Sequence, residues 1–185
     1  SRSVADGLER LRIGYITENR KEEGLFLGSS ISANVTITIW PRLVQRVTRA
    51  ISRARELAVT RQMIRTLDIR TTGPNQRTED LSGGNQQKIC IAKWLAADCD
   101  ILIIDEPTVG VDIGAKEQIH QIIWDLAKKE RKAIILISSD MPETIRISSR
   151  ILVFKDHRIV GEIEGVDDGT KTYEQVSAEI GRHLH

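Results

Sequence analysis

Two short aliphatic runs, with one amphipathic segment between them, constrain the fold of this chain more than any other feature. The runs cover residues 101–104 and 133–137, and a segment of helical periodicity from Asp112 to about Lys129 separates them. A continuous aliphatic run of strand length is typical of a parallel-sheet strand that is covered on both faces. Strand, helix and strand in this order imply a right-handed crossover. The sequence therefore predicts an α/β fold, with a parallel sheet flanked by helices.

Apolar residues recur at three- and four-residue steps in further segments, and this spacing predicts helices. The segments are residues 43–69, 83–97 and 141–147. The first is strongly basic, with eight arginines from Arg42 to Arg70. We expect these arginines to form a solvated helix face, and an anion- or membrane-facing helix is the alternative.

Strand-like segments stand near both ends of the chain. Residues 12–17 predict a short strand, which a charged loop follows as far as Gly24. Residues 151–154 and 159–163 enclose a polar turn, so they predict an antiparallel hairpin. A peripheral helix is expected after Gly165.

Composition limits the class of protein. The 185 residues, of which 40% are hydrophobic, can bury one core, so we expect a single compact domain, with a small projecting lobe as an alternative. The 27 basic and 26 acidic residues nearly balance, which does not favour nucleic acid as a partner. The two cysteines lack metal or disulfide spacing, so reduced thiols in a cytoplasmic protein are expected. Neither a membrane-spanning run nor a signal-peptide pattern is present in the sequence.

Asp105 and Glu106 directly follow the first aliphatic run. Ligands of open parallel sheets bind at the carboxyl ends of the strands. Of two adjacent carboxylates there, one can orient Mg²⁺ through its water shell, while the other can polarise a water for attack on a γ-phosphate. From this pair alone, it is equally possible that Asp105 and Glu106 are ordinary loop residues without a catalytic role.

Ser82, Gly83 and Gly84 stand where the second predicted helix begins. A glycine inside a helix costs up to about 1 kcal/mol relative to alanine, so stability alone does not explain the pair. Bare backbone N–H groups at the positive end of a helix can approach a phosphate closely, and the Ser82 hydroxyl is a further donor. Ser82 can also be a simple N-cap. Asn85 and Gln86 add neutral polar groups beside the same position.

Three ordered motifs carry a family resemblance. Residues 81–87, 104–108 and 110–112 resemble the signature motif, Walker B strand and D-loop of ATP-binding-cassette ATPases. Residues 16–25 and 137–143 are similar to the second nucleotide-binding half of ribose-, galactose- and xylose-type sugar importers. The resemblance extends from Ser3 to about Glu164.

The resemblance implies one partial ATPase domain of the P-loop type over residues 1–185. Residues 38–97 would form its helical subdomain with the signature motif, and residues 98–165 would carry the Walker B strand, the D-loop and the switch strand. Residues 166–185 would be a peripheral tail. No Gly-x-x-x-x-Gly-Lys-Ser/Thr loop occurs in the sequence, so the N-terminal strands and the Walker A loop are expected to be missing.

In the family, two nucleotide-binding halves meet head to tail, and each ATP lies between the phosphate loop of one half and the signature motif of the other. The residues that would contact the partner's ATP are Ser82, Gly83, Gly84, Asn85 and Gln86. The D-loop residue Asp112 would lie between the halves. Glu106 and Asp105 would be the catalytic pair of this half, with Asp105 holding Mg²⁺ through water.

Two positions depart from the family pattern. Glu18 occupies the Q-loop position that is usually glutamine, and Ser139 occupies the switch position that is usually histidine. A carboxylate and a hydroxyl are poor replacements for an amide and an imidazole beside a γ-phosphate. These two positions make this half's own site atypical. Because the Walker A loop is also absent, we predict that the isolated chain has no appreciable ATPase activity and binds ATP and Mg²⁺ weakly or not at all.

The resemblance also implies the partners. These are another nucleotide-binding half, membrane permease subunits and, indirectly, a sugar-binding protein, without nucleic acid, at the cytoplasmic side of the inner membrane. Two alternatives remain open from the sequence. One is a soluble ATPase of DNA repair or translation with the same motifs, and the other is a non-catalytic module that only pairs.

Overall fold

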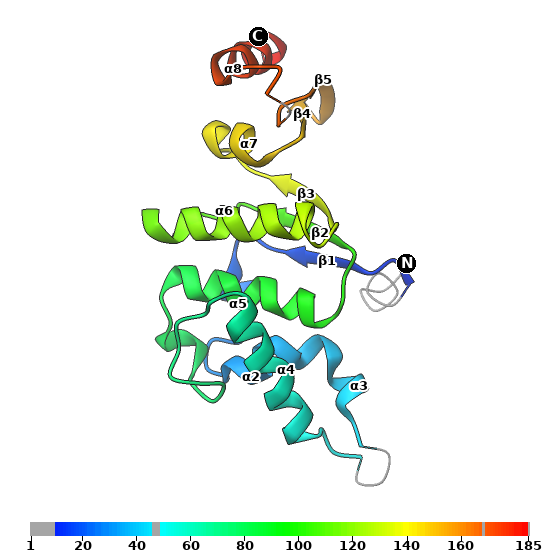
Figure 1. The fold of residues 1–185 in the computed structure, drawn as a ribbon, viewed down its shortest axis with the longest axis vertical. Coiled ribbons are helices and arrows are strands. Elements are labelled where there is room, and N and C mark those ends of the chain that lie inside the picture. Colours follow the sequence, from blue (N-terminus) through cyan, green and yellow to red (C-terminus); the bar gives the residue numbers. More distant parts are fainter. Residues whose placement is uncertain (1–9, 46–48, 168, 185) are drawn as a thin grey trace. The chain divides into compact units, whose positions relative to one another are not determined.

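The computed structural model describes residues 10–45, 49–167 and 169–184. Tertiary contacts divide the chain into two compact units, of which the first ends at Ile135 and the second begins at Leu136. The boundary therefore falls inside strand β3 (Ala133–Ile137). Figure 1 labels the elements of both units.

A parallel sheet forms the centre of the first unit. Strand β1 (Ile13–Ile16) runs parallel to β2 (Ile101–Asp105), with Ile13 opposite Ile101. The strand order is β1-β2-β3, and helix α6 (Ile113–Lys128) connects β2 to β3 in the chain. The predicted α/β fold with a parallel sheet is confirmed.

The two aliphatic strands differ in how far they are covered. Leu102 and Ile104 of β2 are fully buried, whereas Ile135 and Ile137 of β3 are 54% and 47% exposed. The expectation that both strands are covered on both faces is therefore wrong for β3. An aliphatic run reports the preference of branched side chains for strands, but not how many faces other elements cover.

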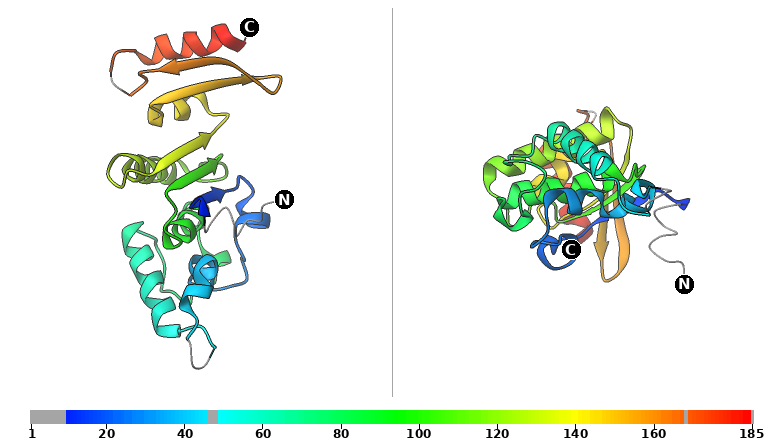
Figure 2. Two further views of the ribbon diagram at one scale, coloured as in Figure 1. Left: turned by 90° about the vertical axis from the view of Figure 1, so that its right-hand side faces the viewer. Right: turned by 90° about the horizontal axis from the view of Figure 1, so that it is seen from below.

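Helices gather beside the sheet in the first unit. Helix α2 (Ile31–Thr36) packs against α4 (Arg53–Thr66) and α5 (Gly83–Ala96), and α5 also packs against α6 (Figures 1 and 2). Shorter helical turns are η1 (Arg20–Gly24), η2 (Ile37–Ile39), α3 (Trp40–Leu43) and η3 (Thr78–Asp80). The side chains that are fully buried in this unit include Ile31, Val35, Ile89, Ile91, Leu102, Ile104 and Ile119.

The long basic helix predicted over residues 43–69 is interrupted. The backbone is extended at Val44, which forms an isolated antiparallel bridge with Ile51. The Ser52 N–H donates to the Leu43 carbonyl at 2.9 Å, which closes this excursion. Apolar residues at helical spacing can equally lie along one side of such a bridge, and periodicity does not distinguish the two arrangements. The predicted helix positions 46–48, including Arg46, lie outside the described residues.

The charged loop predicted before Gly24 also has a different form. Residues Arg20–Gly24 make a single π-helical turn, in which Arg20 and Gly24 are buried. The Lys93 ammonium donates to the Gly24 carbonyl at 2.8 Å, which holds the end of the turn against α5. Charge alone suggested a solvated loop, but long side chains fix this segment to the packed helices.

The second unit builds a small core of its own. Strands β4 (Arg150–Lys155) and β5 (Arg158–Glu164) form the predicted antiparallel hairpin. Helices α7 (Met141–Ile147) and α8 (Tyr173–Leu184) complete the unit. The buried residues that these elements share are Ile145, Ile151, Val153, Ile163, Val176 and Ile180. The helix expected after Gly165 is thus present, and it contributes two side chains to this core.

Both cysteines are free, as the sequence indicated, and the structure shows that both are buried, which makes their reactivity a test of the core. Cys90 is 2% exposed and Cys99 is 0% exposed, and burial raises the pKa of each thiol from 9.0 to about 11. The thiolate is the nucleophile, so we expect neither cysteine to react with a disulfide reagent at pH 8 until the chain unfolds.

The same shift has a consequence for stability at high pH. The folded pKa lies above the unfolded value, so the unfolded chain loses the thiol protons first as the pH rises. The contribution is complete below pH 9.0 and is lost toward pH 11. Thiol titration with and without urea checks that the native cysteines do not react. Urea unfolding of the Cys90→Ala variant from pH 8 to 11, compared with the unmodified chain, checks the loss of stability at high pH. Rapid native labelling at pH 8 would contradict the burial of these thiols.

Candidate functional site

The start of helix α5 presents an exposed serine hydroxyl. Ser82 has the extended backbone of an N-cap, yet its side chain makes no capping hydrogen bond to the helix. Its oxygen instead accepts a hydrogen bond from the Asn85 amide at 3.0 Å. Among the residues that the structure describes, the Ser82 hydroxyl proton has no acceptor. Of the two roles that the sequence suggested, side-chain capping is absent and donation to a ligand is sterically open.

The next two residues are glycines because the chain itself leaves no room for side chains. A Cβ on Gly83 would lie 2.7 Å from the Gly110 carbonyl oxygen. A Cβ on Gly84 would lie 2.4 Å from the Cβ of Ala115. Real Cβ atoms essentially never approach other atoms this closely, so both positions require glycine for packing. This packing reason stands beside the phosphate approach that the sequence suggested.

Gln86 lies apart from the other predicted signature residues. Its side chain is 5% exposed, and its amide donates to the carbonyls of Thr78 and Leu81, both at 3.2 Å. It thus holds the loop that precedes α5. A side chain turned into the chain in this way is not in a position to touch a ligand at the helix start.

The predicted D-loop lies against the same end of α5. Gly110 has a φ of +68°, which glycine adopts without strain, and its carbonyl approaches Gly83 as described above. Asp112 is exposed and caps α6, because its carboxylate accepts the Ala115 N–H at 2.9 Å. The structure therefore brings the predicted signature and D-loop residues together at one place.

Asp105 lies at the carboxyl end of β2 and has a hydrogen-bond partner on β1. The Tyr15 hydroxyl donates to the Asp105 carboxylate at 2.9 Å. This hydrogen bond is the main cause that raises the pKa of Tyr15 above its ordinary value. A donated hydrogen bond restricts the rotation of a carboxylate, so Tyr15 orients the oxygen atoms of Asp105.

The backbone is strained at Glu106. This residue has a φ of +45°, a left-handed conformation that costs a residue with a side chain about 1 kcal/mol or more. Seven other described residues with side chains also have a positive φ, so the strain alone does not mark Glu106 as functional. Thr108, two residues later, is 4% exposed, and its carbonyl accepts the Val111 N–H at 3.4 Å.

The two atypical positions fall in different units. Glu18 is exposed just beyond the end of β1. Because β1 and β2 are parallel neighbours, Glu18 and Asp105 follow the same edge of the sheet. Ser139 is exposed and follows β3 in the second unit.

Sequence reasoning missed two residues of this region. Tyr15 resembled an ordinary strand residue, and Arg20 resembled one charge in a polar loop. The Arg20 guanidinium donates to the carbonyls of Val109 and Gly110, which lie 89 and 90 residues further along the chain. No local pattern indicates contacts over such separations, so only the folded structure reveals them.

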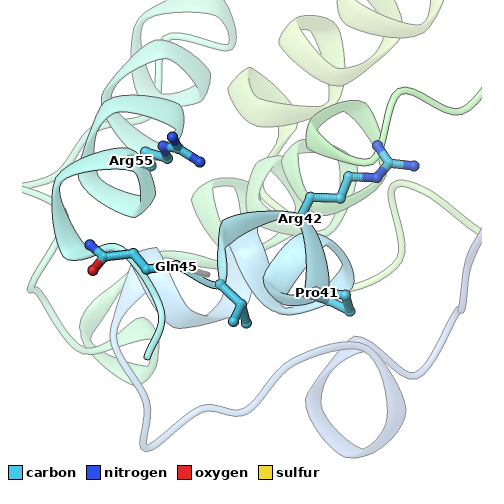
Figure 3. A pocket seen from close by; sticks show the side chains of 5 residues that line it. Pro41, Arg42, Gln45 and Arg55 are labelled. Atoms are coloured by element: carbon cyan, nitrogen blue, oxygen red, sulfur yellow. The ribbon is translucent and has the colours of Figure 1, made fainter. Parts of the chain in front are cut away.

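A pocket in the helical region lies close to part of the basic segment. Its volume is about 770 Å³, and Figure 3 shows the side chains that line it. The lining residues are Pro41, Arg42, Val44, Gln45 and Arg55. None of the predicted signature, Walker B or D-loop residues contributes to it, so this pocket is not part of the candidate site.

The described residues contain neither a cluster of metal-binding side chains nor a membrane-spanning helix. Among residues 10–45, 49–167 and 169–184, no group of three or more His, Cys, Asp or Glu side chains is arranged to hold a metal ion. Within the same ranges, no helix combines the length and the apolar character that crossing a membrane requires. The candidate site therefore consists of three parts: the start of α5, the predicted D-loop at residues 110–112 beside it, and the end of β2.

Comparison with known proteins gives a consistent result. The family model described as ABC transporter matches residues 5–109, which is more than half of the chain. A Burkholderia lata protein whose name places it among the ribose/galactose/methyl galactoside import ATP-binding proteins is 47% identical over 90% of this chain and 32% of its own length. The ribose import ATP-binding protein RbsA of Caldanaerobacter subterraneus is 40% identical over 87% of this chain and 32% of its own length. The chain thus spans about a third of the length of these curated relatives.

Solved structures agree with the fold. The ATP-binding cassette MJ0796, in a dimeric structure bound to ADP and Pi, superposes with a TM-score of 0.67. The superposition covers 82% of this chain and 62% of that chain at 24% identity. At this identity the likeness supports the architecture and not the chemistry.

Proposed function

This chain belongs to the ABC transporter family, and from that premise we propose that it works in an ATP-binding subunit that energises the import of a monosaccharide. In this proposal, the segment from Ser82 to Asn85 completes an ATP site whose phosphate loop belongs to another nucleotide-binding half. The names of the relatives support a sugar as the transported substrate, because they describe ribose or galactoside import.

The exposed hydroxyl of Ser82 is the observation that carries the proposal. It stands at the N-terminus of a helix of 14 residues, and its proton has no acceptor among the described residues. A phosphate at this place would receive a hydrogen bond from Ser82 and the favourable field of the helix end. Gly83 and Gly84 keep the helix start free of side chains. The residues present therefore fit a nucleotide phosphate held from the other side.

Asp105 and Glu106 fit the metal and the water of a phosphoryl-transfer site. A carboxylate at a strand end suits Mg²⁺, which keeps most of its water ligands in proteins. Bound Mg²⁺ would supply charge neutralisation at the phosphates. Tyr15 would hold the Asp105 carboxylate in one orientation through its hydrogen bond of 2.9 Å. Glu106 would accept a proton from the attacking water, and its strained backbone would fix the direction of its side chain.

The proposal assigns a weaker role to this half's own nucleotide. The sequence contains no Gly-x-x-x-x-Gly-Lys-Ser/Thr loop, and Glu18 and Ser139 replace the amide and imidazole of the family pattern. Titration of Mg·ATP into the chain alone is therefore expected to give no stoichiometric heat. Clear binding would mean that the chain holds nucleotide by another route.

The partners follow from the same proposal. They are a nucleotide-binding half with a complete phosphate loop, permease subunits in the inner membrane and, beyond them, a sugar-binding protein. The dimeric arrangement of the structural relative MJ0796 supports the pairing of this chain with another nucleotide-binding half. The chain would then act at the cytoplasmic face of the membrane, through the permease.

A transplant tests the proposal. The chain replaces the aligned segment of the Burkholderia lata relative, and Mg²⁺-dependent phosphate release is measured with the purified chimera. Hydrogen bonds to charged groups contribute about 1.5–3 kcal/mol, so Ser82→Ala is expected to lower kcat/KM by about 10- to 100-fold. Ser149→Ala is the matched control, because it removes an exposed serine hydroxyl of the second unit, and it should leave the rate unchanged.

Three outcomes separate the candidates. Loss of activity in Ser82→Ala alone supports the completed site. A chimera that folds and pairs but releases no phosphate supports a non-catalytic pairing module. A chimera whose ATPase responds to nucleic acid in a salt-dependent way would support the repair or translation class instead.

A further inference from the structure

Arg20 is a buried guanidinium without an ionic partner. Its side chain is 6% exposed. One terminal nitrogen, Nη1, donates to the Val109 carbonyl at 2.6 Å, and the other, Nη2, donates to the Gly110 carbonyl at 3.0 Å. Its Nε is buried and has no acceptor among the described residues. No carboxylate within the described part of the chain forms an ion pair with it.

This arrangement is costly if stability is its purpose. A buried charge loses its hydration, and neutral carbonyls recover only part of that loss. Even buried ion pairs are often replaced by apolar side chains of similar volume without loss of stability, and Arg20 lacks the charged partner that offsets desolvation in such a pair. A long apolar residue at position 20 would therefore fill the same space, and the guanidinium needs another explanation.

The position of the guanidinium gives that explanation. The Cβ that Gly83 lacks would lie 3.0 Å from Arg20 Nη2 and 2.7 Å from the Gly110 carbonyl oxygen. The guanidinium, the turn at residues 109–110 and the first residue of α5 therefore meet at one point. A shift of any of these three segments changes the contacts of the other two.

We infer that Arg20 is a positioning residue that holds the turn at residues 109–110 against the start of α5. It thereby links the segment after β1, which contains Glu18, to the Ser82 hydroxyl and to Asp112. Arg20 touches no ligand in this arrangement and acts through the backbone carbonyls. An effect of Arg20 on ATP hydrolysis rests on the proposed function. The contact between Arg20 and the turn at residues 109–110 does not depend on that function.

Amide hydrogen exchange of the 185-residue chain tests the link. The Val109 and Val111 amides donate to the carbonyls of Glu106 and Thr108 within the turn. Arg20→Met keeps an unbranched side chain as far as the position of Nε and removes the guanidinium donors, so exchange in residues 107–112 is expected to accelerate at least about tenfold. Arg20→Lys restores one donor and should give an intermediate rate.

Controls separate positioning from a general loss of structure. Arg150→Met makes the same change at an exposed ion pair with Glu162 in the second unit, and it should not alter exchange in residues 107–112. Arg20→Ala with millimolar guanidinium should recover slow exchange in this segment, because the ion fits the space that the side chain leaves. Urea does not offer the charge and serves as the matched solute.

The outcomes are distinct from those of the proposed function. Unchanged exchange in residues 107–112, or equal acceleration throughout the first unit, would overturn the positioning role. In the chimera, Arg20→Met is expected to lower kcat at least about tenfold with little change in KM, since it disturbs alignment and not binding. If the unmodified chimera has no ATPase activity but exchange responds as described, the proposed function fails and the link stands.

Discussion

Replacing Gly84 by alanine is expected to lower the free energy of unfolding by about 2 kcal/mol, although alanine is the better helix former. The added Cβ would lie 2.4 Å from the Cβ of Ala115, and both atoms belong to the packed helices α5 and α6. Carbon atoms prefer about 3.5–4.0 Å, so the helices must separate by more than 1 Å. Such overpacking costs about 1–3 kcal/mol, and the gain of up to about 1 kcal/mol in helix propensity offsets only part of it.

A double mutant isolates the cause. Ala115→Gly removes the opposing Cβ and alone should cost about 1 kcal/mol, as a glycine within a helix does. Combined with Gly84→Ala, it should restore most of the lost stability, with a coupling free energy above about 1 kcal/mol. Gly114→Ala is the control, because its Cβ would meet its nearest neighbour, the Asp112 carboxylate, at an ordinary 3.4 Å. Urea unfolding measures all four variants, and additive effects in the double mutant would refute the steric explanation.

This result bears on how glycine motifs are interpreted. The sequence suggested that Gly83 and Gly84 admit a phosphate, whereas the structure shows that the chain's own backbone and Ala115 occupy the space of both Cβ atoms. The two explanations are compatible, and the Ser82 hydroxyl is the feature that a ligand would use directly. A loss of ATPase activity in Gly84→Ala that the double mutant reverses would reflect packing, not lost phosphate contact.

The order of helices and strands was predictable because it depends on local patterns. The run at residues 101–104, the Asp112 cap and the hairpin near Phe154 each occupy a few neighbouring residues, and all are present in the structure. The helix expected over residues 43–69 is present only from Arg53 to Thr66, as α4. Before it, the Gln45 N–H donates to the Ala50 carbonyl and the Ser52 N–H to the Leu43 carbonyl, and these bonds interrupt the helix. Periodicity does not report such bonds.

The candidate site divides in the same way. Asp105, Glu106 and Ser82 were predictable, since each stands at the end of a strand or the start of a helix. The side chains that orient them were not. Tyr15 reaches Asp105 across 90 residues of sequence, and Arg20 reaches Val109 across 89. A single sequence without its fold offers no signal for contacts of this kind.

Replacing Asn34 by aspartate is expected to lower the free energy of unfolding by about 4 kcal/mol at pH 7. Asn34 is 1% exposed, and its amide nitrogen donates to the Phe26 and Ser30 carbonyls and to the Thr78 hydroxyl. Its oxygen accepts the Phe26 N–H at 2.8 Å. An aspartate loses both amide protons and places a buried negative charge among three acceptor oxygens, so it combines desolvation with repulsion. The loop at Phe26 and the loop before α5 would both lose their connection to α2.

The pH dependence of this variant distinguishes charge from shape. Burial raises the folded pKa of a carboxyl group above its unfolded value of about 3.9, so the folded state binds the proton more tightly. Stability is then highest at low pH and falls as the pH rises through the window between the two pKa values. Asn34→Leu, which has a similar shape but no charge, should lose about 2–3 kcal/mol at every pH, because the Phe26 N–H and its neighbours remain buried without a partner. Urea unfolding from pH 4.5 to 7.5, followed through the tryptophans of the first unit, Trp40, Trp94 and Trp124, and compared with the unmodified chain, checks both variants. Equal losses for the two variants at every pH in this range would show that the negative charge adds nothing, and would refute the expected repulsion. A negligible loss in Asn34→Leu would show that the amide does not hold the loops together.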